Sequence, residues 1–424
     1  MRSKPWLWLI ALALVPAVSA PVWGAARPVG TEFQVNGNTE SKQRNPVAAY
    51  NAAGTALVVW ENDKLGLRGR FYGANGAALG NELALVANQV LPGVPAVGEV
   101  KIRKDPAVAF LPSGEFLMAW TEEKAHVRVD IFIETRDVLD LDVYAQKFSA
   151  AGAPIGTATR LNGTTSGFQS VPRIHTRNGA DAIVVWQSDD RRPGGSGDGI
   201  YGRAVSRTTS RPAGSEFKIS PNGAAAGASI AGDAAGNFLV AWEAADSSTL
   251  GVFARLYDRS AHPKGGEFRV NSSTAGLQRR PAVATDRTGG YLVTWQGQYG
   301  GSQKKAHIYG QFLGGAGSFV GPQFQISEGV GPTQISPSVA QLKGGNFLVV
   351  WSDWNDISPL GIYGVEIDKL GNSSGSETRL NDAQVNAWFR TSLAVGASNG
   401  QVMVPWEGFT ARRLGISARR LVEE

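Results

Sequence analysis

Seven short apolar runs that each end in tryptophan constrain the fold of this chain more than any other feature. The tryptophans are 53 to 66 residues apart and are Trp60, Trp120, Trp186, Trp242, Trp295, Trp351 and Trp406. Repeats of this length are typical of propellers and solenoids, in which one small unit of structure recurs along the chain. The runs are short and lie between turn signals, and no helical periodicity accompanies them, so we interpret each run as a β-strand.

Each repeat carries signals for four strands. The first strand begins at a proline, as at Pro46 and Pro281, where no ladder N–H is required, and the second is the run that ends in tryptophan. The third resembles IYGQFL, which ends at Leu313, and the fourth resembles EFRVN, which ends at Asn271. Four short antiparallel strands per repeat correspond to one propeller blade.

The two ends of the repeat region predict how the ring closes. The segment EFQVN at residues 32–36 is a fourth strand with no first, second or third strand before it. The segment ISARRL at residues 416–421 is a third strand with no fourth strand after it. We therefore predict an all-β, seven-bladed propeller of four antiparallel strands per blade, in which the N-terminal strand completes the last blade.

The first 26 residues have the layout of a secretory signal peptide. A basic start, Arg2 and Lys4, is followed by an apolar run at residues 5–18 and then by small residues up to Ala26. An uncleaved membrane anchor is the alternative, but the run is shorter than the roughly 20 residues that a spanning helix needs. We expect residues 1–26 to be removed and residues 27–424 to form a periplasmic or extracellular propeller that has no membrane span.

Composition excludes several classes of function. The chain has no cysteine, which excludes disulfides and thiolate metal sites, and its four histidines are far apart in sequence. Loss of Arg2 and Lys4 lowers the formal net charge from +5 to +3, with 39 basic and 36 acidic residues remaining. Because no long basic cluster is present, we expect no nucleic-acid partner.

Two recurrent elements favour structural roles. We expect the seven tryptophans to fill the wedges between blades, although a ring of sugar-stacking indoles is the alternative. The motif Gln-x-x-Pro, as at Gln43, should tie the first strand to a neighbouring loop. Trp354 and Trp388 lie outside the repeat register in expected loops, so we predict that they contact a ligand.

The combined pattern of EF-x-VN, Q-x-x-P-x-VA, FLVVW and GIYGQ-F resembles the Trp-containing propeller repeats of exported bacterial proteins. The resemblance covers Glu32 to Leu421 and implies a propeller fold, but it implies no activity. The chain departs from WD40 repeats, because no repeat tryptophan is followed by Asp and the Gly-His signature is missing. It also departs from sialidase Asp boxes, because the tryptophan stands nine residues after Asp233 and Asp286 instead of five.

The second repeat has two unusually long connections on the same expected face, at residues 86–105 and 120–144. The alternation in the second connection predicts a hairpin with these opposite pairs: Val129 with Val143, Ile131 with Leu141, and Ile133 with Leu139. Its other face sets Asp130 opposite Asp142, with Asp140 nearby.

Like charges directly opposite each other destabilise a sheet, so the predicted aspartates require compensation. Arg128 would neutralise a solvated face, and Arg103 and Lys104 could reach the aspartates from the neighbouring connection. Bound calcium and a protein partner are the other two interpretations. We take Asp130, Asp140 and Asp142 as candidate ligand-binding residues, and no metal site is specified.

The leading hypothesis is a monomeric, exported, non-enzymatic propeller that binds a protein or a glycan around the second repeat, without a cofactor. The first alternative is a carbohydrate-active hydrolase or lyase that uses loop carboxylates. The second alternative is a structural component of the cell envelope. The candidate carboxylates are Glu61, Asp63, Asp189, Asp190, Glu243, Asp246, Asp353, Asp356 and Glu407. The sequence has no P-loop, His-Glu-x-x-His or EF-hand pattern.

Overall fold

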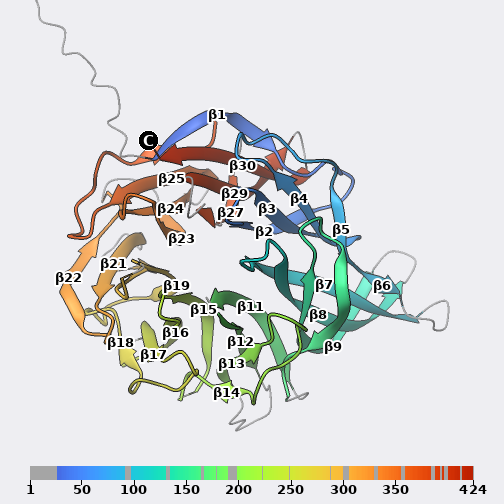
Figure 1. Cartoon of the computed structure of the whole chain (residues 1–424), viewed down its shortest axis with the longest axis horizontal. Helices are drawn as coiled ribbons and strands as arrows, with labels where there is room; N and C mark the ends of the chain where they lie inside the picture. The colour runs from blue at the N-terminus through green and yellow to red at the C-terminus, as the bar shows by residue number, and fades with distance from the viewer. Residues whose placement is uncertain are drawn as a thin grey trace, which may run out of the picture.

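The computed structural model of the chain is a ring of β-sheets (Figure 1). It describes residues 26–90, 97–129, 134–163, 167–177, 179–189, 198–221, 223–247, 249–286, 288–298, 305–328, 333–354, 359–382, 387–391, 394–395, 400–410 and 413–423. The predicted signal peptide at residues 1–26 lies outside these ranges, apart from Ala26. Across the described residues every regular element is a strand, so no helix there could cross a membrane.

The strands of the first half of the chain follow the predicted four-strand order. The first unit is β2 (Gln43–Tyr50), β3 (Ala56–Asn62), β4 (Gly66–Tyr72) and β5 (Leu83–Ala87). After β6 (Gln89–Val90) come β7 (Val97–Phe110), β8 (Phe116–Val129), β9 (Glu134–Phe148) and β10 (Pro154–Arg160). The next unit is β11 (Phe168–Arg177), β12 (Ala180–Asp189), β13 (Gly199–Val205) and β14 (Phe217–Lys218).

The second half continues in the same way. It contains β15 (Ala225–Gly232), β16 (Phe238–Ala245), β17 (Leu250–Tyr257) and β18 (Phe268–Arg269). Next are β19 (Gln278–Thr285), β20 (Tyr291–Gly297), β21 (His307–Leu313) and β22 (Phe319–Gln325). They are followed by β23 (Thr333–Gln341), β24 (Phe347–Trp354), β25 (Pro359–Ile367) and β26 (Thr378–Arg379). The last strands are β27 (Ala387–Thr391), β28 (Ala394–Val395), β29 (Gln401–Thr410) and β30 (Arg413–Glu423), and β1 (Ala26–Gln34) pairs with β30.

The predicted all-β propeller is confirmed, but the described strands form six hydrogen-bonded sheets, so the predicted count of seven is not matched. Five sheets have four or five strands each, and the sixth has nine. The nine-stranded sheet arises because β9 and β11 share a parallel bridge at Leu141 and Phe168. This bridge joins the strands β6–β10 to the strands β11–β14 in one ladder.

The N-terminal strand closes the ring without a covalent link. Strand β1 pairs antiparallel with β30, with Phe33 opposite Ala418. Asn36 then accepts a hydrogen bond from the backbone N–H of Ile416, at 2.7 Å. Asn381 does the same for Ile362, also at 2.7 Å, so β1 is bonded like the fourth strand of another blade.

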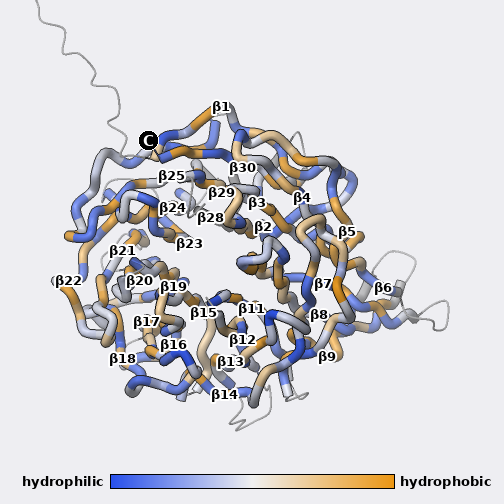
Figure 2. Tube along the Cα trace, viewed as in Figure 1, coloured by the Kyte–Doolittle hydropathy of each residue, from blue (hydrophilic) through white to orange (hydrophobic). Residues whose placement is uncertain are grey.

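The core is divided among the interfaces between neighbouring blades. Figure 2 shows apolar residues distributed around the whole ring. Each repeat tryptophan is at most 1% exposed and belongs to one of these clusters, as its predicted role in the wedge requires. Trp295, for example, packs in one cluster with Leu239 and Val252 of the preceding blade. Burial of such a ring removes a large apolar surface from water and thereby stabilises the interface.

A bulge in the innermost strand provides a second tie between blades. The residue before each bulge proline has positive φ, for example +49° at Asn45 and +53° at Arg280. Its backbone N–H points to the preceding blade, where the residue after the tryptophan accepts it. Glu243 accepts from Arg280 at 2.6 Å, and Thr121 accepts from Val171 at 3.1 Å.

Candidate functional site

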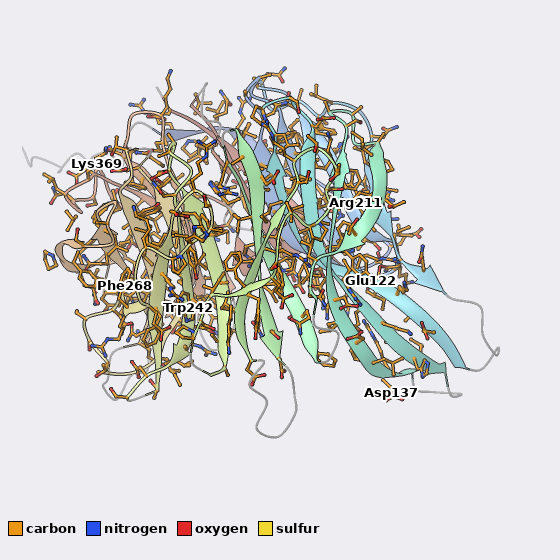
Figure 3. All side chains as sticks on the ribbon, turned by 60° about the horizontal axis from the view of Figure 1, so that its bottom comes forward. Glu122, Asp137, Arg211, Trp242, Phe268 and Lys369 are labelled. Atoms are coloured by element: carbon orange, nitrogen blue, oxygen red, sulfur yellow. The ribbon has the colours of Figure 1, made fainter. Side chains whose placement is uncertain are left out.

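The long connections of the second repeat form a sheet extension that we call the arm, comprising residues 97–104, 121–129 and 134–143. Strands β7, β8 and β9 continue past the tryptophan register and stay paired with one another. The arm projects outward from the ring (Figure 1), and Figure 3 shows Glu122 at its root and Asp137 toward its tip. The prediction that the two long connections lie beside the same blade is therefore confirmed.

The predicted register of the hairpin is wrong. Val143 lies opposite Thr121, and Leu141 lies opposite Glu123. The reason is that β8 continues without interruption from the Trp120–Tyr144 pair, so the register of the blade extends into the arm. Residues 130–133, where the hairpin turns, lie outside the described ranges.

The predicted aspartates are therefore separated differently. Asp142 lies opposite Glu122, and Asp140 lies opposite Lys124, whereas Asp130 falls outside the described residues. Asn162 donates to Asp142 at 2.5 Å, and a guanidinium nitrogen of Arg160 is 3.7 Å from it. Burial, together with the charge of Asp142, raises the pKa of Asp140.

The ion pairs of the arm are formed mainly by two glutamates that the sequence analysis did not single out. Glu122 pairs with Lys101 at 3.0 Å and with Arg103 at 2.8 Å. Glu123 pairs with Lys104 at 2.8 Å and with Arg136. Arg103 and Lys104 do neutralise carboxylates, as expected, but these carboxylates are on β8.

Trp354 and Trp388 do not join the arm. Trp354 ends β24, where its backbone pairs with Thr333, so it is a strand residue and not a loop residue. Trp388 is also in a strand, β27, opposite Glu407. Both strands lie across the ring from β8 and β9 (Figure 1), so the structure divides the predicted site residues into two groups.

Several other candidate acids have structural roles. Glu61 accepts from the side chain of Asn45 at 2.5 Å, and Glu407 accepts from the backbone of Asn45 at 3.3 Å. Asp246 accepts from Thr249 at 2.8 Å within its own turn. Asp190 and Asp356 lie outside the described residues.

Asp353 interrupts the pattern by which the blades bind their tryptophan N–H groups. Trp60, Trp186 and Trp295 donate to the glutamine 17 residues earlier, at 2.8, 3.2 and 2.9 Å. In the β23–β26 blade, Trp351 donates instead to Asp353, at 3.0 Å. The residues at the equivalent position of other blades are Asn62, Glu122, Ser188, Ala244, Gly297 and Gly408.

The released glutamine, Gln334, binds a histidine of the preceding blade. Its side-chain oxygen lies 2.9 Å from Nδ1 of His307, and its own backbone lies opposite Asp353. His307 occupies the start of a third strand, where five blades have the following glycines: Gly66, Gly199, Gly251, Gly361 and Gly415. An amide oxygen only accepts, so Nδ1 is the donor and Nε2 of the neutral ring keeps its lone pair.

The pKa of Asp353 is set by its burial, by the hydrogen bond from Trp351 and by neighbouring charges. It is 6% exposed, and burial raises its pKa to about 7, with the charge of Glu377 acting in the same direction. Burial also raises the pKa of Glu377, while Arg379 lowers the pKa of Asp353. Burial and the charge of Asp353 raise the pKa of Tyr363, which lies opposite Arg379 in the sheet.

The candidate site therefore comprises Asp353, Glu377, Arg379, Tyr363 and His307, at the boundary between two blades. Asp353 was one of the predicted carboxylates, but the sequence analysis did not select the others. The available signal was the loss of glycine at His307. No group of three or more metal-ligating carboxylates and histidines occurs among the described residues, so the calcium hypothesis gains no site there.

The comparisons with known proteins bear on the fold. No protein-family model matches the chain, and no curated protein matches it. A solved protein of unknown function from Dyadobacter fermentans DSM 18053 is similar over 94% of this chain and all of its own, at 10% identity and a TM-score of 0.52.

A polysaccharide lyase of family PL25, an ulvan lyase bound to -[GlcA(1-4)Rha3S]-, covers 94% of this chain and 96% of its own, at 10% identity and a TM-score of 0.52. The α-L-arabinanase of Penicillium chrysogenum covers 93% and 98%, at 12% identity and a TM-score of 0.47. At 10% identity, the likeness to the Dyadobacter protein and to the ulvan lyase shows a shared fold alone.

Proposed function

We propose that this protein is a carbohydrate-active enzyme, a hydrolase or a lyase, in which Asp353 transfers the proton. The observation that carries the proposal is the buried carboxyl of Asp353, whose pKa of about 7 suits general acid–base catalysis near neutral pH. The ulvan lyase of the same fold, which has a saccharide bound, supports the choice of substrate class. This alternative hypothesis replaces non-enzymatic binding as the main interpretation.

Each neighbouring residue has a defined task in the proposed chemistry. Protonated Asp353 donates to a leaving glycosidic oxygen, or ionised Asp353 removes a proton from the sugar ring. For hydrolysis, Glu377 supplies the second carboxyl group that glycoside cleavage requires. For elimination, Arg379 binds the carboxylate of a uronic acid, and the hydroxyl of Tyr363 donates a proton to the leaving glycosidic oxygen. Nε2 of His307 can accept a hydrogen bond from a sugar hydroxyl. These side chains need no cofactor.

The test is an assay of the mature protein against neutral and acidic polysaccharides. New reducing ends without ultraviolet absorbance identify a hydrolase, whereas new reducing ends with an unsaturated, ultraviolet-absorbing product identify a lyase. Loss of product in Asp353→Asn, with product retained in Asp63→Asn, supports the proposal. Equal activity of both variants, or no product from any polysaccharide, contradicts it.

We also propose that the ring has seven blades, because the nine-stranded sheet contains two four-strand sets, β7–β10 and β11–β14. Each set contains its own repeat tryptophan, Trp120 or Trp186. The only β9–β11 pairing among the described residues is the Leu141–Phe168 bridge. An experimental map in which the two sets form separate blades around the ring axis would support seven blades. A map in which they form one blade would refute this number.

We further propose that the chain is an exported member of the Trp-containing propeller repeats, working as a monomer without a nucleic-acid partner. N-terminal sequencing of protein recovered from the periplasm or the medium should begin at Arg27. An N-terminus at Met1 would contradict signal removal.

The arm keeps partner binding as a second candidate function. Val138 is 39% exposed and Leu139 is 45% exposed, on an element that projects from the ring. Apolar side chains in that position favour contact with another protein. Replacing both with serine should abolish co-purification of a specific partner without changing the melting temperature, and unchanged co-purification would argue against the arm.

A further inference from the structure

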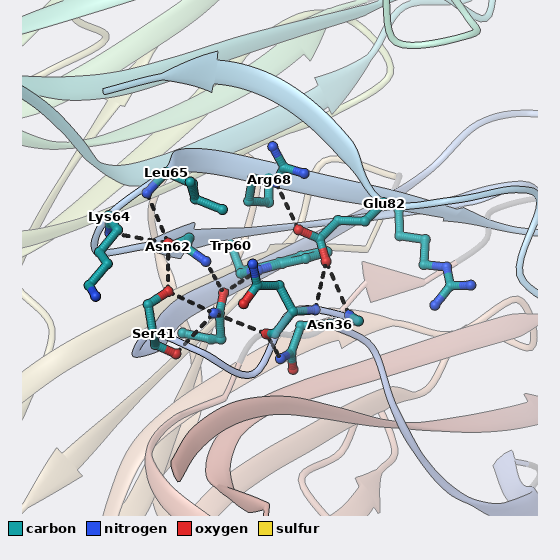
Figure 4. A network of polar contacts seen from close by, with 12 residues as sticks. Asn36, Ser41, Trp60, Asn62, Lys64, Leu65, Arg68 and Glu82 are labelled. Atoms are coloured by element: carbon teal, nitrogen blue, oxygen red, sulfur yellow. Dashed lines mark hydrogen bonds and ion pairs between the residues drawn. The ribbon is translucent and has the colours of Figure 1, made fainter. Parts of the chain in front are cut away.

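A polar cavity of about 580 Å³, shallow and widely open to solvent, lies where the segment after the closing strand β1 meets the first blade. Its lining residues are Gly37, Asn38, Thr39, Glu40, Arg68, Arg70, Asn81 and Glu82. The volume is within the range of roughly 300–1,000 Å³ that is usual for small-molecule sites. Figure 4 shows the hydrogen-bond network beside it, which extends from Asn36 to Glu82. The cavity is separate from Asp353, which belongs to the β23–β26 blade.

The cavity lies beside a departure from the repeat pattern. Five repeat tryptophans face an aromatic residue of the third strand, namely Tyr144, Tyr201, Phe253, Tyr309 and Tyr363. Trp60 faces Arg68 instead, and Trp406 faces Ser417. In another blade the aromatic ring of Tyr309 stacks against Trp295, with ring centroids 6.3 Å apart. A narrow arginine side chain does not fill the space of such a ring, and it places donors there.

Arg68 is held in a fixed orientation. Its Nε donates to Oε1 of Glu82 at 2.8 Å, and its side chain is 18% exposed. Oε2 of Glu82 accepts from the backbone N–H of Gly37 at 3.1 Å and of Asn38 at 3.4 Å. Among the described residues, Arg68 is bonded through Nε, so both Nη groups keep donors for a ligand. A charged side chain that is fixed in this way loses little further entropy on binding.

The charges and groups of the lining define the ligand class. Arg68 and Arg70 are balanced by Glu40 and Glu82, so the cavity has no excess of either charge. Its side chains offer both donors and acceptors, and no aromatic residue lines it. Such a surface matches a neutral molecule with many hydroxyl groups better than an anion or an apolar compound.

We propose that this cavity is a second saccharide-binding site that holds a neutral sugar segment away from the reaction site. The second site rests on the proposed function in one respect only, namely that its hydroxyl-rich ligand is a saccharide. Long substrates would contact both sites, which raises their apparent affinity by linking two weak binding events.

The test is isothermal titration of neutral xylo-, arabino- and cello-oligosaccharides and of acidic oligogalacturonides. The protein carries Asp353→Asn, so that turnover does not consume the ligand. We expect a neutral oligosaccharide to bind, and we expect Arg68→Tyr to weaken its binding by at least about tenfold, a loss of about 1.4 kcal/mol. Arg68→Tyr restores the aromatic residue of other blades and should therefore fold. Tyr201→Phe, at the same register of another blade, is the matched control and should bind normally.

Two results would overturn the inference: equal binding by Arg68→Tyr and the control, or binding of the acidic oligosaccharides alone. The two proposals can fail separately. If no polysaccharide is cleaved but Arg68→Tyr still weakens oligosaccharide binding, the proposed function fails and the second site stands. If a polysaccharide is cleaved but Arg68→Tyr leaves oligosaccharide binding unchanged, the proposed function stands and the second site fails.

Discussion

At the residue scale, Asp353 shows how one substitution within a repeat changes the chemistry of a blade. The equivalent residues Ser188 and Gly297 cannot ionise, and their tryptophans are bound by glutamine. Glu122 is also ionisable at this position, but Lys101 and Arg103 neutralise it. Asp353 is buried, which favours its uncharged form, and this effect exceeds the opposing effect of the indole N–H of Trp351, which stabilises the charged form.

The stability of the protein should therefore depend on pH through Asp353. Its pKa rises from 3.8 to about 7 on folding, so the folded state takes up a proton between these values. Stability consequently falls as the pH rises from about 4 to about 7, by about 4 kcal/mol, and then levels off. Asp353→Asn cannot ionise and should lack this loss. Denaturant unfolding at pH 5 and pH 8 measures both proteins, and a parallel pH response of the two would contradict the burial of an ionisable group.

At the element scale, the start of the third strand is controlled by the space beside the fourth strand. A Cβ added to Gly66 would collide with the carbonyl oxygen of Val86, and its φ is +92°. In the β19–β22 blade His307 stands at this position, and the backbone N–H of the next residue, Ile308, donates to Ser327 just after β22, at 2.9 Å. In the second blade the residue at this position is Asp142, and its carboxylate accepts a hydrogen bond from the side chain of Asn162.

Gly66→Ala should destabilise the protein by about 1–3 kcal/mol through this collision. Gly80→Ala is the matched control, because Gly80 has the same φ of +92° and no atom lies within 4 Å of its added Cβ. The difference between the two unfolding free energies isolates the collision from backbone strain. Equal destabilisation of the two variants would show that the fourth strand does not restrict this position.

The elements were predictable from the sequence to different degrees. Tryptophan spacing and turn residues predicted the strand order, because these signals are local. The alternating residues of the arm are compatible with more than one register, so the sequence predicts that Asp142 pairs with Asp130. In the structure the ladder continues from the Trp120–Tyr144 pair, and Asp142 pairs with Glu122. The contact between His307 and Gln334 joins two blades, and nothing local in the sequence indicates it.

At the scale of the whole molecule, the ring depends on the same bonds at its closure as within the chain. Asn36 and Asn381 make equivalent bonds of 2.7 Å to third-strand backbone N–H groups. At the outer edge, Glu32 accepts from Asp382 at 3.0 Å and Glu82 accepts from Gly37 at 3.1 Å. Each sheet of the ring ends in an outer edge strand, and short edges such as β18 and β26 limit aggregation.

Asn36→Ala and Asn381→Ala should therefore destabilise the protein to a similar extent, about 1–3 kcal/mol each, since each leaves a buried N–H without its acceptor. Thermal or denaturant unfolding provides both values. A neutral Asn36→Ala beside a costly Asn381→Ala would mean that β1 does not close the ring in solution.

The central claim is that Asp353 transfers a proton in the cleavage of a polysaccharide. The most direct measurement is the rate of product formation from the best substrate between pH 5 and pH 9, for the mature protein and for Asp353→Asn. We predict a pH profile with an inflection near pH 7 and a loss of about 10²–10⁴-fold in Asp353→Asn. A rate that is unchanged by the substitution and that has no inflection near pH 7 would contradict the account.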